Sequence, residues 1–490
     1  MYERQKPLPH PHPPTLPPLP SSNRVFLLGS SYLVAASLIE SAQTSMKPFR
    51  FLTLLIALCM APAVGVAQDV PAAAIDSLFA EQNKPDVPGA ALVVMRGDEI
   101  IYEKGYGSAN LEYGLPITPR SVFLVASVSK QFTAFAIAML AEQGKLSLDD
   151  NIRKHVPEMH DFGTPITLRH LIHHTSGLRD EFDLLGMAGW RMDDVITKEM
   201  ILNLAYRQRA LNFEPGSEYS YCNTGYTLLA ETVERVTGQS FREWTTENIF
   251  APLGMAQSHF HDDYRMVVPD RVQGYVKDGD GFKKEVYSYQ SVGASGLFTT
   301  AEDLAKWVRN FKDGTVGGPA VIEQVHERGI LTNGDTLSYA FGLGHGEYKG
   351  HRRVSHSGWH RGFRTNLLRF PDDDLAFILL GNLESFNPVE KTLQVADLYF
   401  APSPEKLADY AGTYYSEELD TTYTLAVEDD RLVLHHRRNN EATLAFDGPD
   451  QFTTTAWYFD KLVFTRQEGT ITGFTASTDR ARNVAFVRTP

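Results

Sequence analysis

Ser127 and Lys130 lie three residues apart, where an apolar stretch ends and a long helical pattern begins. Side chains at positions i and i+3 of a helix share one face, so the hydroxyl and the amine are expected to meet in the first turn of a helix. Burial lowers the pKa of a lysine because desolvation disfavours the ammonium, and a neutral amine can accept a serine proton. Backbone N–H groups at the start of the helix would stabilise an oxyanion.

The Ser-x-x-Lys spacing alone is not specific, because a serine at this position also serves as a helix N-cap. Two further motifs change that balance. Tyr221-Cys222-Asn223 is the only Tyr-x-Asn in the chain, and His356-Ser357-Gly358 is the only segment of the form Lys/His-Ser/Thr-Gly.

The order and separation of these three motifs resemble the serine beta-lactamase and penicillin-binding protein superfamily. The resemblance is to the branch with class C beta-lactamases, D-Ala-D-Ala carboxypeptidases, D-aminopeptidases and related esterases. It covers about residues 70–400. Within this range the stretches 168–178, 213–216 and 296–304 are also similar to that branch.

The resemblance implies a serine hydrolase that forms an acyl-enzyme on Ser127. It would cleave amide or ester bonds of D-amino-acid peptides or related small acyl substrates. A beta-lactamase or small-ester esterase of the same fold is the alternative. A non-catalytic homologue that binds cell-wall peptide or a partner protein is a further alternative.

Within this hypothesis Lys130 and Tyr221 share the proton transfers, with Tyr221 acting as a base only if a lysine ammonium lowers its pKa. Asn223 is expected on the same side of an extended segment as Tyr221, where it contacts Lys130 and the substrate. Alternatively, Asn223 fixes its own loop.

The segment from His356 to Trp359, with Ser357 and Gly358, is expected to be an edge strand that binds substrate. Gly358 has no Cβ, which permits close approach of a substrate backbone. By resemblance, the N–H of Trp359 joins that of Ser127 in the oxyanion hole.

Many beta-lactamases have lysine at the position of His356, and a histidine is mostly uncharged near neutral pH. This difference argues against beta-lactam hydrolysis and favours peptidase or esterase chemistry. His360 and Arg361 either restore the missing positive charge or lie on the solvated surface.

We expect no cofactor and no metal. His170, His173 and His174 lie near Asp180 and Glu181, but their spacing is not that of His-Glu-x-x-His. Cys222 is interpreted as a buried, inert thiol.

The 490 residues carry a formal net charge of −14, which argues against a nucleic-acid partner. Residues 1–45 are interpreted as a disordered, proline-rich extension, with Met46 as a candidate start of translation. Residues 46–67 have the layout of a signal peptide, with Lys47 and Arg50 before an apolar run.

The signal peptide predicts a secreted or periplasmic protein without a membrane span after cleavage. An uncleaved anchor at residues 51–66 is the alternative. Lipid attachment at Cys59 is disfavoured because the bulky Leu58 precedes it.

The pattern predicts an α+β fold for residues 68–402, with an antiparallel sheet built from strands at both ends of the domain and an inserted helical region. The expected strands are residues 90–94, 99–102, 363–370 and 375–380, and the expected helices are residues 129–143, 197–208, 224–237 and 301–312. Residues 403–490 are expected to form a small all-β barrel or sandwich with strands at 410–415, 423–427, 431–435, 443–446, 461–466, 471–476 and 484–488.

An α/β-hydrolase is excluded because no serine has the flanking glycines of Gly-x-Ser-x-Gly. The exact substrate and the oligomeric state stay open from the sequence.

Overall fold

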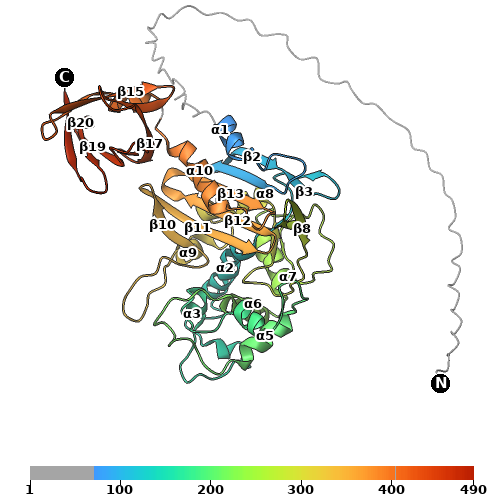
Figure 1. Ribbon diagram of the computed structural model, residues 1–490. Helices are drawn as coiled ribbons and strands as arrows, with labels where there is room; N and C mark the ends of the chain where they lie inside the picture. The colour runs from blue at the N-terminus through green and yellow to red at the C-terminus, as the bar shows by residue number, and fades with distance from the viewer. Residues whose placement is uncertain (1–70, 403, 490) are drawn as a thin grey trace, which may run out of the picture. The chain divides into compact units, whose positions relative to one another are not determined.

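The computed structural model describes residues 71–402 and 404–489 (Figure 1). The proline-rich extension and the predicted signal peptide lie outside the described residues. Within the described ranges, no helix is both long and apolar enough to cross a bilayer.

An antiparallel sheet organises residues 71–402, with the strand order β10-β11-β12-β13-β1-β2. Two strands come from the N-terminal end of this region and four from its C-terminal end, which confirms the predicted assembly. In Figure 1 the blue strand β2 and the orange strands β12 and β13 belong to this sheet. The strands are β1 (Ala90–Arg96), β2 (Glu99–Tyr106), β10 (Gly344–Tyr348), β11 (His351–His360), β12 (Phe363–Phe370) and β13 (Leu375–Gly381).

Alternate residues of the sheet enter two separate cores, as the two-residue period of a strand requires. Leu92 and Val94 pack in a core with side chains of α1 (Ala72–Leu78) and α10 (Pro388–Phe400). Val93 and Met95 point into a larger core on the opposite face, which includes α2 (Ser129–Glu142) and α8 (Ala301–Asp313). The sheet is therefore covered by helices on both faces.

Helix α2 is buried on all sides, since every residue from Ser129 to Leu140 is buried. The sequence suggested an amphipathic helix here, but the first turns bury the polar residues Ser129, Lys130, Gln131 and Thr133 and the rest is largely apolar, so the helix has no solvent-facing side up to Leu140. The predicted helices at 197–208, 224–237 and 301–312 are observed as α5 (Lys198–Arg207), α6 (Asn223–Thr237) and α8. The remaining helices of this region are α3 (Leu168–Ile172), α4 (Glu181–Met187), α7 (Phe241–Thr245) and α9 (Gly318–Gln324).

Several short strands had no clear signal in the sequence. A three-stranded sheet has the order β5-β9-β6 and holds the segment before Ser127 in place. The short strands are β3 (Ser108–Asn110), β4 (Leu115–Pro116), β5 (Phe123–Leu124), β6 (His259–Phe260), β7 (Gly274–Asp278), β8 (Gly281–Glu285) and β9 (Leu297–Thr299).

After the short helix α11 (Pro404–Leu407), the chain forms a closed antiparallel barrel in which each strand pairs with the next and β14 pairs with β21. The barrel contains one strand more than the seven predicted, because β18 has only three residues and lacks a recognisable alternation. The strands are β14 (Gly412–Ser416), β15 (Thr421–Glu428), β16 (Arg431–His435), β17 (Ala442–Gly448), β18 (Gln451–Thr453), β19 (Lys461–Gln467), β20 (Thr470–Ser477) and β21 (Val484–Thr489). The predicted fold class is confirmed.

Candidate active site

Ser127 lies in the 3-10 turn Ala126–Val128, immediately before α2 rather than in its first turn as the sequence predicted. Ala126 has a φ of 49°, in the left-handed region that alanine rarely occupies. Such strained backbone persists where the surrounding structure enforces it and is often found at functional sites.

Lys130, on the first turn of α2, is fully buried, and its Nζ lies 3.2 Å from Ser127 Oγ. The same nitrogen lies 2.8 Å from Asn223 Oδ1 and 2.8 Å from the carbonyl oxygen of Ala294. Burial lowers the pKa of Lys130 to about 7, although the nearby Glu181 and Asp180 act in the opposite direction. A substantial fraction of the amine is therefore neutral near pH 7 and can accept a proton.

Asn223 is the first residue of α6 and not part of an extended segment as expected. Its backbone N–H donates to Asp180 Oδ2 at 2.6 Å and its side-chain amide donates to the same oxygen at 2.9 Å. Asp180 also caps α4, because its Oδ1 accepts from the N–H of Phe182 at 2.9 Å. The Asn223 side-chain oxygen is thereby oriented toward Lys130.

Tyr221 precedes α6, and its ring centroid lies 4.8 Å from Lys130 Nζ. The ring stacks at a tilt on His174, with 4.2 Å between centroids, and its side chain is 38% exposed. Desolvation raises the pKa of the Tyr221 phenol above its usual value, and hydrogen bonding with Ser127 opposes that shift only in part. The phenol is therefore protonated near neutral pH, and the condition for Tyr221 to act as a base is not met.

The segment from His356 to Trp359 lies in the second half of β11. Strand β10 pairs with β11 only up to Ser355, so residues beyond it have β12 as their hydrogen-bonded neighbour. The segment is thus an edge as expected, although the strand as a whole is not. Ser357 and Trp359 are exposed, whereas His356 and Gly358 are buried.

Gly358 packs directly against the segment that leads into Ser127. A Cβ at this position would lie 2.2 Å from the carbonyl oxygen of Val125 and 2.3 Å from Thr365 Oγ1. The Thr365 hydroxyl donates to the same Val125 carbonyl at 2.9 Å. The missing side chain therefore makes room for the chain's own backbone rather than for a substrate, which corrects the reason given from the sequence.

Both ring nitrogens of His356 are used inside the protein. Nδ1 lies 2.7 Å from the carbonyl oxygen of Ser357, so it carries the proton, and Nε2 accepts from the hydroxyl of Tyr339 at 3.0 Å. Burial, followed by the charge of Lys130, lowers the pKa of His356 to about 4. His356 is neutral near pH 7 and is not available as a cation for a substrate carboxylate.

His360 and Arg361 do not restore the missing positive charge. His360 is buried, and burial lowers its pKa to about 4. Arg361 forms an ion pair with Glu285 at 2.6 Å. The alternative that both lie on the solvated surface is also wrong for His360.

The histidine-rich segment, residues 170–174, packs against the segment that carries Tyr221. His174 Nδ1 accepts from the backbone N–H of Cys222 at 3.0 Å, and the His173 ring contacts the carbonyl of Glu327 at 3.2 Å. Among the described residues no group of histidine, cysteine and acidic side chains is arranged to hold a metal ion. Burial raises the pKa of the Cys222 thiol to about 12, as expected for an inert side chain.

The structure brings Ser127, Lys130, Tyr221 and Asn223 together, with His356 6.3 Å from Tyr221 between ring centroids. Three participants were missed in the sequence. Asp180 precedes a helix and looks like an ordinary N-cap, and the backbone carbonyl of Ala294 has no sequence signal. Tyr339 belongs to no motif, and only the fold brings it to His356.

The fold and this arrangement of a serine, a buried lysine and a tyrosine define the class of serine hydrolases built on a Ser-x-x-Lys pair. The family model described as Beta-lactamase matches residues 75–400, and the chain belongs to this family.

Comparisons with individual proteins agree with the family. The chain is 28% identical to "Penicillin-binding protein 4*" of Bacillus subtilis strain 168 over 74% of its own length and 86% of the relative. It is 28% identical to a D-aminopeptidase of Gluconobacter oxydans over 68% of its length and 63% of that relative, so it spans less than two thirds of the second protein. The structure of an octameric penicillin-binding protein homologue from Pyrococcus abyssi matches with a TM-score of 0.61 and 25% identity, over 86% of this chain and all of that one.

Proposed function

We propose that the protein hydrolyses amide or ester bonds of D-amino-acid peptides or related small acyl compounds through an acyl-enzyme on Ser127. The observation that carries the proposal is the buried amine of Lys130, 3.2 Å from the Ser127 hydroxyl and with its pKa lowered to about 7. A module that only binds a ligand has no need for a desolvated lysine beside a serine.

In the first step the Ser127 oxygen attacks the substrate carbonyl while its proton moves to Lys130 Nζ. The carbonyl oxygen becomes an oxyanion, which the N–H groups of Ser127 and Trp359 stabilise. As the C–N or C–O bond breaks, Tyr221 supplies a proton to the leaving amine or alkoxide and regains one from Lys130. Water then attacks the acyl-enzyme, and its proton returns by the same groups to release the acid and free Ser127.

The division of labour between the two bases follows from their pKa values. The pKa of Lys130 is lowered toward neutrality, whereas that of Tyr221 is raised. We therefore assign proton acceptance to Lys130 and proton donation to Tyr221. His356 holds Tyr339 and the strand in position rather than binding a substrate carboxylate.

The neutral His356 and the paired Arg361 favour substrates without a free carboxylate next to the scissile bond. This supports aminopeptidase, amidase or esterase chemistry over carboxypeptidase or beta-lactamase chemistry. The D-aminopeptidase among the relatives supports D-amino-acid substrates.

The substrate proposal is tested with the purified protein and a matched panel. D-alanyl and L-alanyl p-nitroanilide, a D-Ala-D-Ala peptide, nitrocefin and a short-chain ester are compared by kcat/KM. We expect the D-alanyl anilide or the ester to be turned over fastest and Ser127→Ala to abolish turnover. Preference for nitrocefin would contradict the substrate class, and preference for the D-Ala-D-Ala peptide would contradict the inference that substrates lack a free carboxylate next to the scissile bond.

We further propose that residues 46–67 are a signal peptide and that the protein acts outside the cytoplasm. The basic residues Lys47 and Arg50 before an apolar run support this. Mass spectrometry of the exported protein should find a mature N-terminus at Gln68. A cytoplasmic protein that retains residues 46–67 would contradict it.

A further inference from the structure

Arg369 carries a buried guanidinium in which two nitrogens have no hydrogen-bond partner. It lies on β12 between Val354 of β11 and Ala376 of β13, and only 7% of its surface is exposed. Within the described part of the chain, its Nε and Nη2 have no hydrogen-bond partner, and no carboxylate forms an ion pair with it. The guanidinium lies over the ring of Phe311, with 3.7 Å between the guanidinium carbon and the ring centroid.

Such an arrangement is costly for the protein. Buried polar groups almost always find a partner, and a buried charge without one requires compensation beyond a contact with an aromatic face. Burial and the charge of Arg352 lower the pKa of Arg369 to about 9, which still leaves it positively charged near pH 7. This buried cation without a carboxylate partner is therefore a candidate for pairing with an anion from outside the chain.

Arg369 lines a cavity of about 200 Å³ that could hold this anion. The cavity lies where the turn after β1, the end of α8 and the connection from β12 to β13 meet. Its other polar lining residues are Asp98, Arg309, Lys312 and Asp374. The volume exceeds the roughly 30 Å³ of one liquid water, so a group of several heavy atoms fits.

The charges around the cavity favour a negative ligand. Asp98 and Asp374 are exposed and lie 3.7 and 3.5 Å from Lys312 Nζ, so one lysine partly neutralises them. Arg309 donates to the backbone carbonyl of Asp98 at 2.6 Å. The nearby His326 is neutral, because burial and then the charge of Arg369 lower its pKa to about 3.

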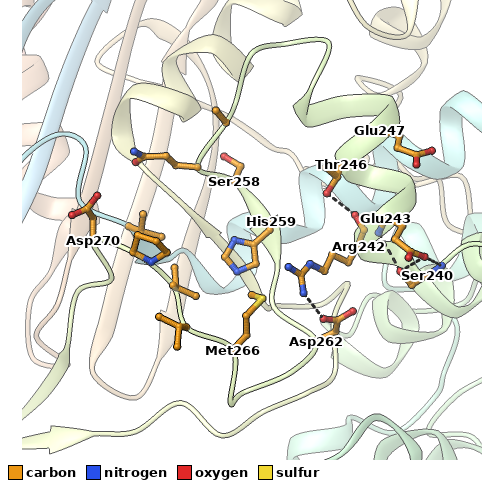
Figure 2. A pocket seen from close by; sticks show the side chains of 16 residues that line it. Ser240, Arg242, Glu243, Thr246, Glu247, Ser258, His259, Asp262, Met266 and Asp270 are labelled. Atoms are coloured by element: carbon orange, nitrogen blue, oxygen red, sulfur yellow. Dashed lines mark hydrogen bonds and ion pairs between the residues drawn. The ribbon is translucent and has the colours of Figure 1, made fainter. Parts of the chain in front are cut away.

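A second cavity offers a comparison for the arginine in the cavity lining. The cavity of about 830 Å³ beside α7 also contains an arginine, but Arg242 is paired with Asp262 at 3.2 Å (Figure 2). Ser240 and Glu243 on its wall hydrogen-bond to each other. The arginine of that cavity is thus paired with a carboxylate within the chain, whereas Arg369 is not.

We propose that the cavity at Arg369 is a binding site for a small oxyanion, either phosphate or the carboxylate of a small metabolite. The guanidinium lines the cavity and supplies the positive charge and N–H donors that arginine uses to bind phosphate and carboxylate oxygens. Arg309 and Lys312 offset the charges of Asp98 and Asp374, so the lining keeps the one positive charge of Arg369. This site is separate from Ser127. It lies at the end of β12, beside the C-terminal part of α8.

Isothermal titration of the full chain with inorganic phosphate, and separately with sodium acetate, tests the site at constant ionic strength set by sodium chloride. We expect at least one of the two anions to bind at millimolar concentration or below. Arg369→Met should weaken that binding at least about tenfold, because it removes the guanidinium with its N–H donors and its charge. Binding of phosphate alone identifies a phosphate site, and binding of acetate alone identifies a carboxylate site.

Arg352→Met is the matched control, because Arg352 is paired with Asp372 at 2.7 Å and does not line the cavity. It removes one positive charge from the same sheet, and we expect affinity within about twofold of the wild type, since the Arg352 guanidinium is half exposed and already paired with Asp372. If Arg369→Met does not fold, Arg369→Lys keeps the charge without the fork and should bind more weakly than the wild type. Absence of binding by both anions, or equal affinity in the Arg369 and Arg352 variants, would overturn the proposal.

Discussion

At the scale of single residues, the three contacts of Lys130 determine what its amine can do. A neutral amine has two N–H groups and one lone pair. Asn223 Oδ1 and the Ala294 carbonyl can only accept, so they take the two N–H groups. The lone pair then faces the hydroxyl of Ser127, which is the orientation required of a general base.

The pH dependence of activity should report the state of Lys130. Its amine accepts a proton only in the neutral form, and its pKa is lowered to about 7. We expect kcat/KM to rise through pH 7 and to fall about tenfold per unit at lower pH, as for titration of one essential base. A profile that stays flat from pH 5 to 8 with a stable substrate would remove Lys130 from this role.

Replacement of Lys130 should separate activity from stability. Lys130→Met should reduce turnover at least about a thousandfold, the scale of a lost catalytic base or nucleophile. The lowered pKa means that the unfolded state binds more protons than the folded state between pH 7 and the usual lysine value of 10.5. Wild-type stability should therefore rise with pH across this range.

The lowered pKa of Lys130 also predicts how the stability of Lys130→Met compares with that of the wild type. Lys130→Met should be more stable than the wild type at pH 7, with a difference that shrinks toward pH 10. Urea denaturation at several pH values measures both slopes. A variant that is less stable at pH 7 would show that the three hydrogen bonds of Lys130 outweigh the cost of burying its charge.

At the scale of elements, Asp180 joins the starts of two helices. One carboxylate oxygen caps α4 through Phe182, and the other accepts from the backbone and side chain of Asn223 at the start of α6. α6 has no side-chain cap of its own, because Cys222 occupies that position without one. The position of the Asn223 side chain therefore depends on a residue from another helix.

Asp180→Ala should cost about 1–3 kcal/mol in the free energy of unfolding, since it removes two caps. It should also reduce kcat, because Asn223 loses the partner that orients it toward Lys130. Asp183→Ala is the control on the same helix, where an exposed acid near the N-terminus contributes less than about 1 kcal/mol. Equal effects of the two substitutions would mean that Asp180 acts only through the helix dipole.

Gly358 connects β11 to the turn that carries Ser127. Because a Cβ there would lie 2.2 Å from a backbone oxygen, Gly358→Ala should cost at least about 2 kcal/mol and displace Ser127, with a corresponding loss of activity. Gly346→Ala on β10 is the control, since its Cβ would first contact the flexible side chain of Arg353 at 3.3 Å. Full activity in the Gly358 variant would show that the two segments can separate without harm.

The sequence predicted the elements with strong periodicity and the motifs with fixed spacing. The spacing of Ser127 and Lys130 specified their contact before the fold was known, and strands 363–370 and 431–435 have the expected bounds. The helix predicted at 224–237 begins one residue earlier, at Asn223, and the contact of Asn223 with Asp180, 43 residues away, had no sequence signal. Arg369 also gave no signal, since an arginine on a strand is usually exposed and only the sheet order shows that it is buried.

At the scale of the whole molecule, the two hydrophobic cores of the sheet and the core of the barrel share no residues. The sheet cores contain residues between 75 and 399, whereas the barrel core contains residues between 407 and 486. Separate cores support our proposal that residues 68–402 and 403–490 are two domains. Each domain would then unfold in its own transition.

Leu434→Ala tests this division, because Leu434 is fully buried in the barrel. We expect a loss of about 2–5 kcal/mol confined to the barrel transition, with activity retained under conditions where the barrel is unfolded. Leu379→Ala in the sheet is the matched control and should lower the other transition. A single transition shifted by both substitutions would indicate one cooperative unit.

Covalent labelling tests the central claim most directly. The purified protein is treated with a fluorophosphonate probe at pH 8, where most of Lys130 is neutral, and its peptides are analysed by mass spectrometry. The mechanism predicts one adduct, on the peptide that contains Ser127, and no adduct in Ser127→Ala. An unlabelled wild-type protein, or an adduct that persists in Ser127→Ala, would contradict it.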